Sequence, residues 1–215
     1  MKTKYLIIVI TLIVFRNTFT QQSQISKTVN HISNYIASEE FLQLKNKIGD
    51  VSAVDSIFID ATRFTEGNIS EALLALMLAT VPYTEVPIQI PLFNSTVNFP
   101  LTSAGGEIFL SKNENLPRYL FFDSPTNKYG DKDKLAHFFG SAFLSNESNI
   151  FDIGKLIGYF VEAFEESFKV QSGVDIRDLD VNEYGRLFGK LLKENKDLLP
   201  SQIFLLRSIR FLRVT

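Results

Sequence analysis

The stretch "DKDKLAHFFG", residues 131–140, decides how the second half of the chain is interpreted. It places four charged side chains and His137, one of only two histidines, directly ahead of an apolar run. Helix positions three and four apart are neighbours, so Asp133, Lys134 and His137 share one face, which Gly140 continues. The stretch therefore predicts a helix that buries an apolar face and also carries a polar cluster.

Three further helical patterns follow this stretch. They are "NIFDIGKLIGYFVEAFEESFKVQSG" (149–173), "DIRDLDVNEYGRLFGKLLKEN" (175–195) and "LPSQIFLLRSIRFLR" (199–213). Gly173 is typical of a helix C-terminus, and Asp178 or Asp180 suits the N-cap of the next helix. A proline stands near the start of the last pattern, as is common in helices. The sequence thus predicts a C-terminal bundle of three to four helices over residues 131–215.

Glycines recur on the polar faces of these helices. A glycine inside a helix is about 1 kcal/mol less favourable than alanine, and close approach of another helix would offset this. The glycines expected at such contacts are Gly140, Gly154, Gly158, Gly185 and Gly189. We therefore expect the three faces to meet and to enclose a polar cluster of Asp133, Lys134, His137, Glu162, Glu165, Asp178 and Asn182.

Such a cluster allows three interpretations. Buried polar groups need mutual partners, so the cluster could be a network that holds the helices in register, which we favour. It could instead be a metal or acid–base site, with His137, Glu162 and Asp178 as catalytic candidates. His137, Glu162 and Glu165 would then be the candidate ligands of a divalent metal, although the spacing matches neither H-E-x-x-H nor an EF-hand loop. A cleft for a ligand or lipid is the third interpretation.

The ordered motifs carry a family resemblance over residues 131–189. They are D-K-x-x-H-F from Asp133, G-x-x-x-E-x-x-[DE] from Gly158 and D-L-x-x-N-x-x-G from Asp178. This set resembles the YfiM-like lipoproteins, a family of the bacterial cell envelope. The resemblance implies an envelope location and a helical domain, and it implies no particular reaction. The chain differs from that family in having no lipid-anchor cysteine and about 100 additional residues before the motifs.

The preceding region, residues 21–130, is predicted to be mixed. Helical spacing covers residues 24–49, ending at Gly49, whereas the β-branched stretch "VDSIFIDATRF" (54–64) predicts a strand. "SEALLALMLATV" (70–81) predicts a buried helix, with a strand as the alternative. Three prolines in residues 86–101 favour an irregular hairpin around Asn94 and Ser95, and "SAGGE" (103–107) a turn. The predicted fold class is therefore α+β, mainly helical, with a short N-terminal hairpin.

The amino-terminal residues predict export. A basic start is followed by the apolar run of residues 5–15, and small side chains precede Gln21. This pattern is typical of a signal peptide over residues 1–20, with a retained membrane anchor as the alternative. With no cysteine, the exported chain would rely on packing alone. We therefore expect a protein that is periplasmic or otherwise associated with the envelope.

The net charge of the chain limits the classes of partner that it is expected to bind. Without residues 1–20 the chain keeps 19 basic residues against 24 acids, which disfavours nucleic-acid binding. An envelope protein or a membrane surface is a candidate partner. The last helix is expected to dock on the core, with a position on a membrane surface as the alternative, because its basic residues are few. The sequence thus predicts an exported helical scaffold or binding module. The alternative is a small metal-dependent or acid–base hydrolase acting on an envelope component.

Overall fold

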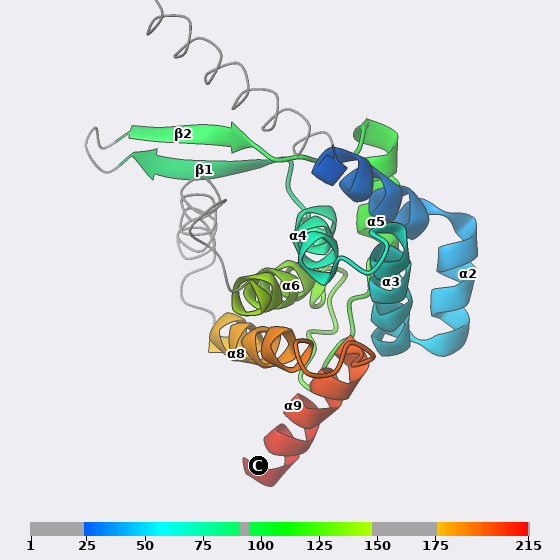
Figure 1. The fold of residues 1–215 in the computed structure, drawn as a ribbon, viewed down its shortest axis with the longest axis vertical. Helices are drawn as coiled ribbons and strands as arrows, with labels where there is room; N and C mark the ends of the chain where they lie inside the picture. Colours follow the sequence, from blue (N-terminus) through cyan, green and yellow to red (C-terminus); the bar gives the residue numbers. More distant parts are fainter. Residues whose placement is uncertain (1–23, 91–94, 148–175, 215) are drawn as a thin grey trace, which may run out of the picture.

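The computed structural model describes residues 24–90, 95–147 and 176–214, and their architecture is all-α (Figure 1). The predicted α+β class is therefore wrong. After a helix at 24–37, the elements are α2 (Glu39–Ile48), α3 (Asp50–Phe64), α4 (Ile69–Thr80), β1 (Glu85–Ile90), β2 (Ser95–Pro100), α5 (Gly106–Asn115), α6 (Lys132–Asn146), α8 (Ile176–Leu191) and α9 (Pro200–Val214).

The predicted strand at residues 54–64 is wrong, because this stretch belongs to α3. Val54, Ile57, Phe58 and Ala61 are all buried and follow one another at helical spacing. Burial of this stripe outweighs the β-preference of the isoleucines and valine, which is a weak and context-dependent effect. The apparent alternation arose because Ile59, 42% exposed, faces away from the core.

The helical interpretation of residues 24–49 and 70–81 is confirmed, with one refinement. Ser38 divides the first segment, because its hydroxyl accepts a hydrogen bond from the Phe41 amide (3.1 Å) and caps α2. Gly49 then ends α2 with a positive φ of 83°, which favours glycine. In α4, nine of twelve residues are buried, so the buried helix was the correct alternative.

The hairpin and α5 complete the N-terminal half. β1 and β2 pair antiparallel, with Glu85 opposite Pro100 and Ile90 opposite Ser95. The predicted turn at Asn94 lies outside the described residues. A two-stranded ribbon adds no sheet layer to the fold, and in Figure 1 it extends to one side of the helices. α5 begins inside the predicted "SAGGE" turn and was not predicted.

One hydrophobic core draws on residues from Val29 to Phe204. In Figure 1, α4, α6 and α8 follow one another across the molecule, and α9 reaches both α8 and α3. Phe138 of α6 lies at the centre, with its ring centroid 5.2 Å from that of Phe188 and 4.8 Å from that of Phe204. These rings join α6, α8 and α9 into the described part of the predicted bundle.

No helix within the described ranges is long and apolar enough to cross a membrane. The predicted helix at 149–173 lies outside these ranges.

Candidate functional site between α6 and α8

Two glycines of α8 let that helix approach α6 closely. A Cβ atom at Gly185 would overlap the Phe138 carbonyl oxygen, and one at Gly189 would overlap the Ala142 carbonyl oxygen. Gly140 serves a different contact, because a Cβ there would lie 3.0 Å from the Met77 sulfur of α4. Gly154 and Gly158, the other two predicted packing glycines, lie outside the described residues. Where α6 and α8 cross, the backbone of α8 therefore lies directly against the backbone of α6.

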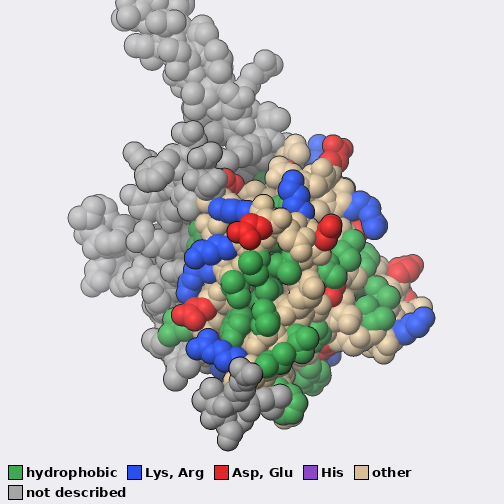
Figure 2. Space-filling model, turned by 60° about the horizontal axis from the view of Figure 1, so that its bottom comes forward, with side chains coloured by type: hydrophobic (Ala, Val, Ile, Leu, Met, Phe, Trp, Pro, Cys, Tyr) green, Lys and Arg blue, Asp and Glu red, His purple; other side chains and the backbone are tan. Residues whose placement is uncertain are grey.

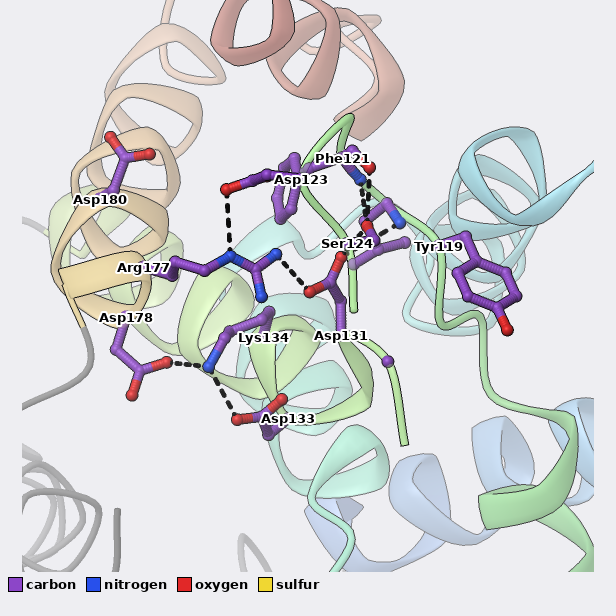
Figure 3. A network of polar contacts seen from close by, with 12 residues as sticks. Tyr119, Phe121, Asp123, Ser124, Asp131, Asp133, Lys134, Arg177, Asp178 and Asp180 are labelled. Carbon is purple, nitrogen blue, oxygen red and sulfur yellow. Dashed lines mark hydrogen bonds and ion pairs between the residues drawn. The ribbon is translucent and has the colours of Figure 1, made fainter. Parts of the chain in front are cut away.

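Lys134 is central to the polar cluster between these helices (Figure 3). Its ammonium donates to Asp133 Oδ2 at 2.9 Å and to Asp178 Oδ1, and its residue is only 4% exposed. One turn along α6, His137 Nε2 lies 3.8 Å from the same Asp178 oxygen. A further turn along, the Ser141 hydroxyl donates to Asn182 Oδ1 at 2.9 Å.

The structure thus brings together five of the seven residues predicted for the cluster. These five are Asp133, Lys134, His137, Asp178 and Asn182. The remaining two, Glu162 and Glu165, lie outside the described residues. Ser141, which follows His137 by four residues on α6, joins the cluster through Asn182.

Burial controls the charge of His137. Desolvation lowers the pKa of this imidazole from its ordinary 6.5, while Asp178 and Asp133 act in the opposite direction. The lowered pKa leaves the ring neutral at pH 7. A neutral imidazole can accept a proton, but this residue is only 7% exposed.

A second network adjoins the first and was not predicted (Figure 3). Asp131, the last residue before α6, is fully buried. Its carboxylate accepts a hydrogen bond from Arg177 Nη2 at 2.6 Å, and others from the Ser124 hydroxyl and the Leu120 amide. Arg177 also donates to Asp123 at 3.1 Å. The first turn of α8 is thereby fastened to the segment between α5 and α6.

Arg207 extends this second network to α9. Its guanidinium donates to Asp123 Oδ1 at 2.7 Å and to Asp180 Oδ2 at 2.6 Å, and it lies 4.2 Å from the Phe121 ring centroid. Hydrogen bonding to Arg207, helped by the charges of Arg207 and Arg177, lowers the pKa of Asp123 to about 2. One set of ion pairs therefore connects three parts of the fold: the segment that precedes α6, helix α8 and helix α9.

The sequence does contain an indication that Arg207 is buried and paired with an acid. It stands four residues after Ile203 and three after Phe204, in the stripe that is buried. A charge in a buried stripe requires a partner, because an unpaired buried charge is very unfavourable. For Asp180, the sequence suggests only a role as a helix cap. Asp123 and Ser124 lie in an irregular segment, where no periodicity points to burial.

The metal and catalytic roles predicted for the cluster stay predictions. Within residues 24–90, 95–147 and 176–214, no group of three or more His, Asp or Glu side chains is arranged to hold a metal ion. Of the predicted ligands, only His137 is described. The carboxylates of Asp133 and Asp178 are both engaged by the Lys134 ammonium, so a metal cation would have to compete with it.

Comparison with known proteins adds no assignment. The chain matches no family model, no curated protein and no solved structure. The resemblance to the YfiM-like lipoproteins therefore stays a prediction.

Proposed function

We propose that this chain is an exported protein of the bacterial envelope that acts as a helical scaffold or binding module. In this proposal, the cluster between α6 and α8 holds the two helices in register. The observation that carries it is the buried Lys134 ammonium, which bonds the buried carboxylate of Asp178 and the partly exposed carboxylate of Asp133. Export is supported by the basic and apolar amino terminus of the sequence.

The spacing of the cluster supports a role in register. On α6, Lys134 and Ser141 are two turns apart; on α8, their partners Asp178 and Asn182 are one turn apart. A slip of one turn would separate both pairs, and because Gly185 and Gly189 are one turn apart, it would also place a residue with a side chain against one of the two α6 carbonyls. Leaving buried polar groups unpaired is strongly unfavourable, so the pairs select one arrangement of the helices.

The alternative, a small metal-dependent or acid–base hydrolase, is less well supported. It would need His137 and Asp178 to reach a substrate, and these residues are 7% and 8% exposed. Asp178 also bonds Lys134, so it is not a free general base.

Exchange of the buried pair for apolar side chains tests the proposal. Lys134→Met and Asp178→Leu should each lower the free energy of unfolding by about 3–5 kcal/mol, because each leaves a buried charge with fewer partners. The double variant should recover most of that loss, since apolar replacement of a whole buried pair is often neutral. Urea unfolding followed by circular dichroism measures all three values.

Lys190→Met is the matched control, because Lys190 is an exposed lysine of α8 and its replacement should change stability little. Elemental mass spectrometry on protein purified without chelator completes the test. A near-stoichiometric divalent metal that is lost in His137→Ala and Asp178→Asn would contradict the scaffold proposal and favour the hydrolase.

Export is tested separately. Expression of the full chain in a bacterium should place it in the periplasmic or envelope fraction, with an amino terminus at Gln21. Intact protein confined to the cytoplasm would overturn the proposed location.

A further inference from the structure

α9 is apolar on two opposite faces. One face carries Ile203 and Phe204, which are each 1% exposed and pack in the core. The other face carries Leu205, Leu206 and Ile209, which are 61%, 48% and 46% exposed. At about 100° per residue, the exposed group is centred nearly opposite the buried one. A surface helix normally shows polar residues on its outer face, so this second apolar face indicates a docking surface.

The sequence that carries α9 is basic, although one of its arginines, Arg207, is buried and paired with Asp123 and Asp180. Residues 186–215 hold seven lysines and arginines against two acids, whereas the other 185 residues hold 15 against 22. Arg186, Lys190, Lys193, Lys196 and Arg210 are all exposed. Figure 2, turned so that the end with α9 comes forward, shows hydrophobic side chains gathered on this face, with both basic and acidic side chains around them. The apolar face of α9 thus belongs to the basic end of an otherwise acidic chain.

We infer that the outer face of α9 binds the surface of an anionic lipid membrane. Apolar side chains of a helix that lies flat on a bilayer enter the boundary between headgroups and acyl chains. Lysines and arginines near them are attracted by anionic headgroups. The inference names the partner of the binding module and rests on that proposed function.

The network around Arg207 supports this mode of binding. Arg207 is 4% exposed and fastens the inner face of α9 through Asp123 and Asp180. The helix can therefore present Leu205, Leu206 and Ile209 while it stays docked. Among the described side chains of α9, three apolar ones are exposed on this face, which favours reversible binding of the folded protein to the surface.

A second copy of the chain fits this surface less well. A symmetric dimer places the same patch of both copies face to face. Two basic ends would then meet, and juxtaposed like charges disfavour association. Anionic headgroups offer the opposite charge instead.

Vesicle co-sedimentation of the full chain, purified after export, tests the inference. The probes are vesicles that contain phosphatidylglycerol and vesicles of phosphatidylcholine alone. The parent should bind the anionic vesicles, and added salt should weaken this binding. Leu205→Asp should lower the partition coefficient at least about tenfold, because it removes a leucine that the membrane would otherwise bury. Arg210→Gln should lower it about fivefold, through loss of one basic residue.

Leu110→Asp is the matched control, because Leu110 is 65% exposed on α5 and its replacement should leave binding unchanged. Circular dichroism verifies folding, and Leu206→Gln replaces Leu205→Asp if that variant does not fold. Equal binding by the parent and the α9 variants would overturn the inference, as would no binding. Light scattering that shows a dimer dissociated by Leu205→Asp, without vesicle binding, would assign the surface to a second copy.

The two proposals can fail separately. An exported protein that does not bind vesicles would refute only the inference that α9 binds a lipid surface. A cytoplasmic protein that binds vesicles through α9 would refute only the envelope location.

Discussion

At the scale of single residues, Lys112 shows how one buried amine couples stability to pH. Its residue is 1% exposed, and its Nζ donates to the Val81 carbonyl oxygen and to Asn113 Oδ1, both at 2.8 Å. Burial, with a smaller contribution from the charge of Lys132, lowers the pKa of this amine to about 7. No carboxylate contributes to this shift, so the protonated form is poorly stabilised.

Lys112→Met should therefore change the pH dependence of stability. The unfolded chain has the ordinary lysine pKa of 10.5, so it binds more protons than the folded chain between about pH 7 and 10.5. The free energy of unfolding of the parent rises across this interval, by at most roughly 5 kcal/mol from this group. The variant should be more stable than the parent below pH 7 and lose that advantage toward pH 10.5.

Urea unfolding at a series of pH values measures the difference. Lys47→Met, which replaces an exposed lysine of α2, is the control and should follow the parent. Parallel profiles for the parent and Lys112→Met would show that Lys112 is charged in the folded chain.

At the scale of elements, the contact of α6 with α8 depends on the absence of two side chains. Gly185→Ala should lower the free energy of unfolding by about 2–3 kcal/mol, because the new methyl group would overlap the Phe138 carbonyl oxygen. Gly106→Ala is the control: no atom lies within 4 Å of a Cβ there, and alanine is the better helix former. Thermal unfolding distinguishes the two, and an equal response would mean that α6 and α8 can separate easily.

The regular repeat of the helices explains which parts of the fold and of the site could be predicted from the sequence. Helical spacing located α4, α6, α8 and α9 and placed Lys134 and His137 on the polar face, because a helix repeats every 3.6 residues. The strand predicted within α3 was wrong, since β-branched residues also suit a buried helix stripe. The network of Asp123, Asp131, Arg177 and Arg207 was missed because an irregular segment supplies half of it.

At the scale of the whole molecule, Arg207 joins parts of the chain that are far apart in sequence. Arg207→Met would retain the apolar stem and remove the bonds to Asp123 and Asp180. We expect a loss of about 3 kcal/mol, as for other buried pairs with one partner removed. Hydrogen exchange should then show the largest loss of protection in α9, while α4 changes only with global stability.

Arg210→Met provides the comparison, because that guanidinium is exposed and its removal should leave the protection of α9 unchanged. If both variants left α9 equally protected, the packing of Ile203 and Phe204 alone would hold the helix.

The core also determines when the folding of a newly made chain can be completed. Phe204 packs against Phe138 and Phe121, and α9 packs on α3, whose residues precede it by about 150 positions. A chain that emerges amino end first cannot close this core until residue 204 is free, so the earlier helices wait incompletely packed. The last helix therefore sets the moment at which folding of the chain becomes complete.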